Sequence, residues 1–239
     1  MKIFFVILLG MLIYQLLNII FPNNYFPSIF ELMNSFVKNF SNKDIYIDII
    51  NSLLKVSVGF FIASIIGIIL GLVLGSTQKF KFIVKIIEIL RPIPPIAWIP
   101  IAIIIFGLGN LSAYFIVFLG AFFPIFTNTY FGALSLPLIY KNTALSFEIS
   151  HPAYFFKILL FNALPNIFTG LKIGIGMAWM SVIAAELIGS QSGLGYFIQL
   201  NRLLLRTDNI LIGMITIGVI GNLLQNLIEI IRKKSIYWE

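Results

Sequence analysis

Long apolar segments alternate with short polar connections along almost the whole chain. An α-helix that crosses a bilayer needs about 20 mostly apolar residues. Six segments reach or approach this length, namely Ile3–Phe21, Leu53–Gly75, Ile93–Gly109, Leu111–Phe131, Ala163–Gly189 and Ile210–Ile231. The pattern predicts an all-α, polytopic bundle of about six transmembrane helices.

The first and third segments each need a decision. Lys2 precedes the first, as in a signal peptide, but the apolar run is long and no A-x-A cleavage site follows, which favours an uncleaved helix. The third is short and contains Pro94, Pro95 and Pro100. Prolines are tolerated in a span where neighbouring helices satisfy the freed carbonyl groups, so this segment is expected inside the bundle.

The connection of residues 22–51 is too long for a turn. Ser28 and Glu31 form the pattern of a capping box at a helix start. The helix that follows has one apolar face, made by Ile29, Met33, Phe36, Val37 and Phe40. We therefore divide the chain into an N-terminal helix with an external amphipathic segment (1–51) and a main transmembrane domain (52–239).

Composition supports the membrane assignment. Of the 239 residues, 59% are hydrophobic and 10% are charged, against about 25% charged in soluble domains. The net charge of +7 does not indicate nucleic-acid binding, because the basic residues stand at the ends of apolar runs and form no dense stripe. Cysteine is absent from the sequence, which excludes disulfides, thiolate metal sites and a cysteine nucleophile.

The distribution of basic residues predicts the orientation. With the N-terminus inside, the cytoplasmic segments hold Lys2, Lys79, Lys81, Lys85, Arg91, Lys141, Lys157, Arg232, Lys233 and Lys234. The external segments hold only Lys38, Lys43, Arg202 and Arg206, while Lys55 and Lys172 lie within spans and are set aside. The predicted location is the plasma or inner membrane of the cell. The positive-inside rule then places both termini in the cytoplasm.

Enzyme motifs are missing from the sequence. The single histidine, His151, has no HExxH context, and neither a GxSxG nor a P-loop GxxxxGK[ST] occurs. No catalytic residue, cofactor site or metal site is therefore predicted, and the chain is not expected to be an enzyme.

Small residues recur at intervals of four in two of the spans. One series is Gly59, Ala63, Gly67, Gly71 and Gly75, and the other is Gly170, Gly174 and Ala178. Such faces let helix backbones approach closely. Two readings stay open, a sliding or dimer interface and ordinary packing within the bundle.

Glu186 is the one acidic residue well within an apolar run. An ionisable group in a span is costly, so it is expected to face protein or water. Gly189, Gly193 and Gly195 follow it and permit tight turns back towards a pathway. We predict a structural or gating role rather than substrate contact, with the carboxylate bound by the backbone of this loop or by Arg202 or Arg206.

The cytoplasmic connection of about 132–162 contains two predicted short helices. One covers Leu138–Phe147, a break follows at 148–150, and Ser150 can cap the second, with Pro152 in its first turn. Tyr154, Phe155 and Phe156 add aromatic surface. The result is a compact knob that suits docking of a soluble partner, although a plain surface loop and rings packed on the bundle are the alternatives.

Particular strings in the sequence resemble a known family. RPIPPIAWIPIAIIIFGLG, FFPIFTNTYFGA and the stretch TALSFEISHPAYFFKILLFNALPNIFTGLKIGIGMAWMSVIAAELIGSQSGLGYFI are similar to binding-protein-dependent ABC importer permeases. The resemblance covers the chain from about Ser52 to its end. It points to the branch that handles sulfonates, taurine, nitrate, bicarbonate or thiamine-precursor pyrimidines.

The resemblance implies a type I importer fold and a set of partners. Two permease subunits would form the pathway, two separate ATP-binding ATPase subunits would dock on their cytoplasmic loops, and an external binding protein would deliver the solute. The second permease is expected to be an identical copy. The main alternative function is a channel or secondary transporter that works without an ATPase.

The family's coupling motif, EAA-x3-G-x9-I-x-LP, falls on residues 142–165. Asn142, Thr143 and Ala144 stand where EAA is usual, Glu148 stands for the glycine, and Phe161 replaces a common proline. The positions that agree are Ala144, Ser150, Leu164 and Pro165. Glycine at this position supplies a left-handed turn that glutamate adopts only at a cost. These departures from the motif bear on how strongly the chain couples to an ATPase and on which partner it uses.

Overall fold

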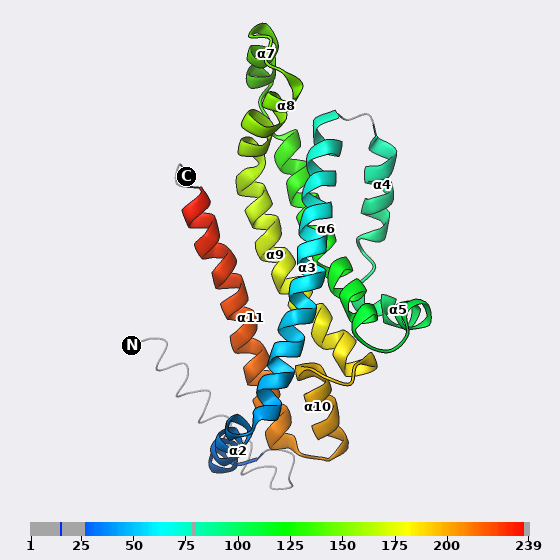
Figure 1. Cartoon of the computed structure of the whole chain (residues 1–239), viewed down its shortest axis with the longest axis vertical. Helices are drawn as coiled ribbons and strands as arrows, with labels where there is room; N and C mark the ends of the chain where they lie inside the picture. Colours follow the sequence, from blue (N-terminus) through cyan, green and yellow to red (C-terminus); the bar gives the residue numbers. More distant parts are fainter. Residues whose placement is uncertain (1–14, 16–26, 78–79, 237–239) are drawn as a thin grey trace.

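The computed structural model describes residues 15, 27–77 and 80–236, and every regular element in these residues is helical (Figure 1). The predicted first span lies outside the described residues except for Gln15. The elements are α2 (Ile29–Ser41), α3 (Lys43–Thr77), α4 (Lys81–Leu90), η1 (Pro95–Trp98), α5 (Ile99–Phe106), α6 (Asn110–Leu134), α7 (Leu138–Ser146), α8 (His151–Tyr154), η2 (Phe155–Leu159), α9 (Leu160–Gly189), α10 (Leu194–Leu203) and α11 (Thr207–Ser235). The all-α prediction is confirmed.

Four helical segments are long and apolar enough to cross a membrane. They are α3, α6, the continuous run of α8, η2 and α9 (His151–Gly189), and α11. Each contains one of the predicted spans, but α3 begins ten residues before the predicted start at Leu53. The extension carries Asp44 and Asp48, which hydropathy alone assigned to a connection.

The predicted third span, Ile93–Gly109, is not a straight helix. The apolar segment begins at Lys81, and α4 is bent by 89° relative to Pro95–Phe106, so together they form one broken or re-entrant segment. Pro94 and Pro95 explain the break, because a residue before proline is disfavoured in the α-helical region and proline itself has no N–H to donate.

This bend changes the position of one basic residue. Arg91 lies at the far end of α4, ten residues from Lys81, which at 1.5 Å per residue is about 15 Å along the helix. That distance is about half of the roughly 30 Å hydrocarbon core. The sequence placed Arg91 in a cytoplasmic connection, whereas in the structure it stands at the break inside this apolar segment, and the other predicted inner residues still outnumber the outer ones.

α6 forms the centre of the bundle, between α3 on one side and α9 on the other. The glycine faces of both helices pack directly on it. A Cβ atom at Gly59 would lie 2.5 Å from Cγ1 of Val117, and one at Gly174 would lie 2.8 Å from Cγ1 of Ile125. The reading of these faces as ordinary bundle packing is correct, and they are not left open for a second subunit.

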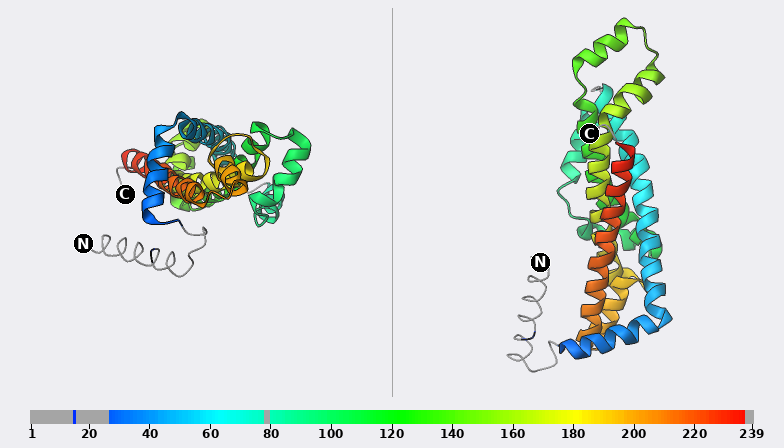
Figure 2. Two further views of the ribbon diagram at one scale, coloured as in Figure 1. Left: turned by 90° about the horizontal axis from the view of Figure 1, so that it is seen from below. Right: turned by 90° about the vertical axis from the view of Figure 1, so that its left-hand side faces the viewer.

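α2 begins at the predicted capping box, with Ser28 and Glu31 bonding to each other's backbone N–H groups. It lies across the ends of the long helices (Figure 2). Its polar side contacts α11, where Ser35 donates to Asp208 and Asn39 donates to Asn209. Its apolar side leaves Met33 and Val37 exposed, which suits a helix at a membrane surface.

Candidate functional site

A buried polar cluster lies where α3 and α9 meet, at the end of the bundle away from α7. Glu186 and Lys55 are 1% and 2% exposed, and 3.0 Å separates Lys55 Nζ from Glu186 Oε1. Ser52 Oγ lies 2.9 and 2.8 Å from the two carboxylate oxygens, and the Gly195 N–H donates to Oε2 over 2.9 Å. A buried charge is tolerable only when paired and hydrogen-bonded in this way.

The same cluster holds the loop between α9 and α10. Lys55 Nζ donates to Ser190 Oγ over 2.8 Å and to the Ser192 carbonyl over 2.6 Å. The Gly193 N–H donates to Asp48 Oδ1, and the Leu194 N–H donates to Ser52 Oγ. The loop, α3 and α9 are thus joined through one set of side chains.

Two of the three predicted loop glycines are required by this geometry. Gly193 has a φ of 108°, and a Cβ there would lie 2.1 Å from Glu186 Oε1. A Cβ at Gly195 would lie 2.6 Å from the Glu186 Cβ and 2.7 Å from the Ile183 carbonyl oxygen. Gly189 differs, since its nearest neighbour is the flexible side chain of Ile103 and its carbonyl accepts from the Gly109 N–H.

The predicted partners of Glu186 were half right. The loop backbone does bind the carboxylate, through Gly195, but the cation is Lys55, whereas Arg202 and Arg206 are exposed. Sequence reasoning set Lys55 aside as a residue within a span. The missed signal is that one acid and one base in apolar spans have strong reason to pair with each other.

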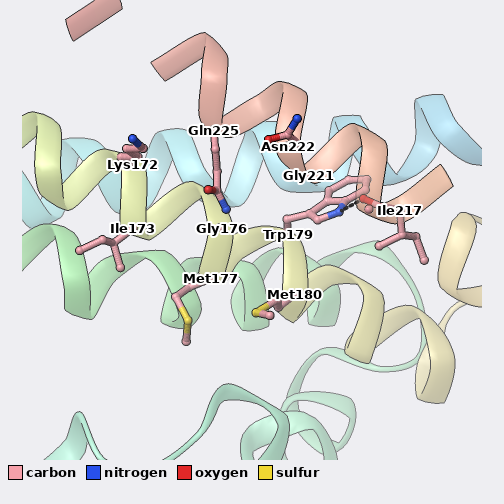
Figure 3. A pocket seen from close by; sticks show the side chains of 11 residues that line it. Lys172, Ile173, Gly176, Met177, Trp179, Met180, Ile217, Gly221, Asn222 and Gln225 are labelled. Atoms are coloured by element: carbon pink, nitrogen blue, oxygen red, sulfur yellow. Dashed lines mark hydrogen bonds between the residues drawn. The ribbon is translucent and has the colours of Figure 1, made fainter. Parts of the chain in front are cut away.

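A second ion pair joins α9 to α11. Lys172 Nζ lies 2.9 Å from Glu229 Oε2, with the side chains 43% and 25% exposed. It stands at one end of a groove of about 660 Å³ between the two helices (Figure 3). Gln225 reaches towards Gly176 in this groove, and Trp179 Nε1 donates to the Ile217 carbonyl over 2.9 Å.

The predicted knob projects beyond the ends of α3 and α6 as α7 and α8 (Figures 1 and 2). α7 ends one residue before the predicted boundary, and it carries Asn142, Thr143 and Ala144. Glu148 has a φ of 49°, the left-handed conformation expected at the position of the family's glycine. The Ile149 N–H then donates to the carbonyl of the buried Ala144, and this hydrogen bond closes the turn.

Ser150 is the N-cap residue of α8 and Pro152 lies in its first turn, as predicted. The Ser150 side chain, however, makes no capping hydrogen bond, and only its carbonyl is used, by the Tyr154 N–H. The π-helical turn η2 follows, and Pro165 lies inside α9. Pro165 has no N–H to donate within α9, and the π-helical turn is a separate irregularity that ends six residues before it.

Only one of the three rings predicted to be exposed on the knob is exposed. Tyr154 and Phe155 are half-buried against Leu159 and its neighbours at the base of the knob. For these two rings the alternative prediction, packing on the bundle, is correct. Phe156 is 61% exposed and Phe147, which sequence reasoning passed over, is 76% exposed. Further exposed apolar side chains on the knob are Leu138, Ile139, Tyr140 and Leu145.

Comparison with known proteins identifies the family. A family model described as the binding-protein-dependent transport system inner membrane component matches residues 59–233. The chain belongs to this family. It is the multi-pass inner-membrane permease subunit of a binding-protein-dependent ABC importer, and it is not itself an ATPase. The family implies ATPase and binding-protein partners, which decides against a channel or secondary transporter.

Individual relatives cover most of the chain. The nitrate import permease protein NrtB of Synechocystis sp. is 40% identical over 201 residues, which are 82% of this chain and 72% of that protein. The bicarbonate transport system permease protein CmpB of Synechococcus elongatus is 37% identical, with 78% and 68% covered. The putative aliphatic sulfonates transport permease protein SsuC of Bacillus subtilis is 30% identical, with the same coverage.

One solved structure supports the fold. The inward-facing MetNI methionine ABC transporter matches with a TM-score of 0.68 at 20% identity, over 77% of this chain and 92% of the matched chain. At this identity the likeness concerns the fold alone.

Proposed function

We propose that this permease imports a small oxyanion of the nitrate, bicarbonate or sulfonate type, driven by an ATPase that docks on the knob. The main support for ATPase docking is the apolar surface of the knob, which projects from the bundle. Its side chains Phe147, Leu138 and Ile139 are all more than two-thirds exposed. A few side chains near the centre of an interface carry most of its binding energy, and aromatic rings such as that of Phe147 are enriched in interfaces. A water-exposed patch of this kind is typical of a docking site.

The solute class is supported by the relatives. Three of them, 30–40% identical over about seven-tenths of their own length, are named as permeases for nitrate, bicarbonate and aliphatic sulfonates. These solutes share a compact group of oxygens with a negative charge. Taurine is a sulfonate and belongs with them, whereas a pyrimidine precursor of thiamine does not share this chemistry.

Orientation follows from the knob and from the remaining basic residues. An ATPase is cytoplasmic, so the knob end of the bundle is the inner end, and α2 and the Lys55–Glu186 cluster lie at the outer end. Lys81 and Lys141 at the inner side, and Arg232, Lys233 and Lys234 at the end of α11, agree with this direction. The end of α11 is then cytoplasmic, and the predicted first span, which lies outside the described residues, would bring the N-terminus to the same side.

Pairing with a second permease is supported by the α9–α11 groove. Lys172, Asn222 and Gln225 line this groove on an open face of the bundle. Polar side chains facing hydrocarbon are costly, and a second copy opposite this groove would enclose them around a water-lined path. The mass of the complex in detergent tests this, and a stable complex with one permease subunit would refute it.

The docking proposal is tested with Phe147→Ala. The permease is captured in detergent and the binding of its ATPase subunit is titrated. Loss of an anchor residue is expected to cost at least about 1 kcal/mol, roughly a fivefold to tenfold weaker Kd. Leu223→Ala, which removes a 60% exposed side chain from α11, is the matched control and should bind normally. Wild-type affinity of Phe147→Ala would remove the support for docking at this surface.

A further inference from the structure

Two basic residues inside the long apolar helices are paired. Lys55 is bound by Glu186 and Lys172 by Glu229. Arg91 is exposed, and within residues 27–77 and 80–236 it has no ion pair or side-chain hydrogen bond. Glu88, three residues earlier on α4, makes no ion pair with it either. An ionisable side chain in an apolar membrane segment, without a partner among the described residues, marks a functional site by default.

Arg91 borders a cleft of about 280 Å³ where the α4–η1 bend meets α6 and α9. Thr127 and Asn128 contribute polar groups from α6, while Phe123, Ile173 and Met177 provide apolar walls. Asn128 donates one N–H to the Pro124 carbonyl, and no residue within 27–77 or 80–236 accepts from its other N–H. The cleft therefore offers a guanidinium, an amide and a hydroxyl in a mainly apolar enclosure.

We propose that this cleft binds a small oxyanion on its way through the subunit, with Arg91 as the cationic group. The proposal deepens the function proposed above and rests on it for the direction of transport. A guanidinium matches the oxygens of a planar or tetrahedral oxyanion by parallel N–H bonds, which a neutral solute or a cation does not offer. Thr127 and Asn128 can donate to the remaining oxygens.

The cleft is placed where a transported ion would meet it. Ile173 and Met177 line both this cleft and the α9–α11 groove, so the two hollows share one edge of α9. Figure 3 shows Ile173 and Met177 pointing away from α11, on the side of α9 opposite Gln225. An ion bound at Arg91 would thus be next to the face that a second permease subunit closes.

The test uses the absence of cysteine from the sequence. Thr127→Cys is introduced, the permease is assembled with its ATPase in nanodiscs, and two thiol reagents of similar size are compared. These are sulfonatoethyl methanethiosulfonate, an anion, and (trimethylammonio)ethyl methanethiosulfonate, a cation. Arg91 is expected to favour the anionic reagent on the order of tenfold, because a fixed charge in a low-dielectric cleft concentrates opposite charge.

The matched pair of variants is Arg91→Gln and Lys81→Gln, each of which removes one positive charge from α4 or its end. Arg91→Gln should abolish the preference and Lys81→Gln should keep it. Millimolar nitrate, bicarbonate or ethanesulfonate should slow the reaction of the anionic reagent with the introduced cysteine when Arg91 is present. The same anions should not slow this reaction in Arg91→Gln. An equal rate ratio in Arg91→Gln, or no reaction with either reagent, would overturn the proposal.

Two further measurements distinguish a failure of the cleft assignment from a failure of the proposed function. Nanodiscs with and without phosphatidylglycerol show whether a lipid phosphate occupies the cleft, and protection by this lipid but by none of the three anions would overturn the solute assignment. Uptake of the same anions into proteoliposomes is measured in parallel. If none is imported while the Arg91-dependent preference persists, the function proposed above fails and the anion cleft stands. If uptake is normal in Arg91→Gln, the cleft assignment fails and the function stands.

Discussion

Lys55 and Glu186 are 131 positions apart in the chain, yet their side chains form a buried ion pair with 3.0 Å between Nζ and Oε1. Lys55 belongs to α3 and Glu186 to α9, and both also bind the loop that begins at Ser190. The pair therefore ties two spans and a connecting loop together at one end of the bundle. A rearrangement that separates α3 from α9 at this end has to break it.

Removal of one partner of this pair should destabilise the protein more than removal of both. Glu186→Ala leaves Lys55 buried without its counter-charge, and the expected loss is about 3–5 kcal/mol. Transport should fall with it, because the loop loses its anchor. The double variant Lys55→Met with Glu186→Leu should lose less stability than Glu186→Ala alone, as measured by denaturant unfolding in detergent, and an equal or larger loss would contradict the prediction. Lys172→Ala, at the more exposed pair, should cost less than Glu186→Ala.

The glycine at 193 should tolerate no side chain. Gly193→Ala combines a backbone conformation that costs about 1–3 kcal/mol for other residues with a direct overlap on the Glu186 carboxylate. Gly107→Ala is the matched control, since Gly107 has a φ of 77° but open space around it. The thermal midpoint of Gly193→Ala should drop further than that of Gly107→Ala. Equal drops would mean that the contact with Glu186 adds nothing to the backbone strain.

Restoring glycine in the knob should stabilise it. Glu148 has a left-handed conformation, which costs a residue with a side chain about 1–2 kcal/mol. Glu148→Gly removes this cost, but glycine also raises the conformational entropy of the unfolded chain, which offsets part of the effect. A net stabilisation of about 0.5–1 kcal/mol is expected. Protection of the α7 amides in hydrogen exchange measures it. A lower protection in Glu148→Gly would show that the carboxylate contributes something that the turn requires.

Cysteine labelling tests the orientation. Cysteines that replace Asn34 or Gln191 should react with an impermeant thiol reagent added to intact cells, and one that replaces Ser146 should react only after lysis. All three positions are exposed. Asn34 serves better than the neighbouring Ser35, whose hydroxyl binds Asp208 and whose loss would disturb the contact of α2 with α11. Reaction of the Ser146 site in intact cells would reverse the topology.

Much of the architecture was readable from local pattern. Runs of about 20 apolar residues have few alternatives to a membrane helix, so the spans of α3, α6, α9 and α11 followed from hydropathy. The capping box at Ser28 and Glu31 and the break at Glu148 depend on residues close in sequence, and both were predicted correctly. Local chemistry is sufficient where the interacting groups are within a helical turn of each other.

The tertiary structure decided what depends on the angle between helices and on contacts between distant segments. The prolines led us to expect the third span inside the bundle, and that prediction is wrong, because the segment is bent by 89° and most of its apolar side chains, such as Ile104 and Ile105, are exposed. Only the tertiary structure placed Arg91 in one cleft with Thr127 and Asn128. Glycine periodicity predicted close packing, but not that α6 is the partner of both glycine faces. Likewise a lone glutamate in a span requires a partner, and several cations were available; folding selected Lys55, because α3 and α9 pack with these two side chains at the same height. A sequence determines which side chains need partners, and the relative rotation and depth of the helices determine which partners they find.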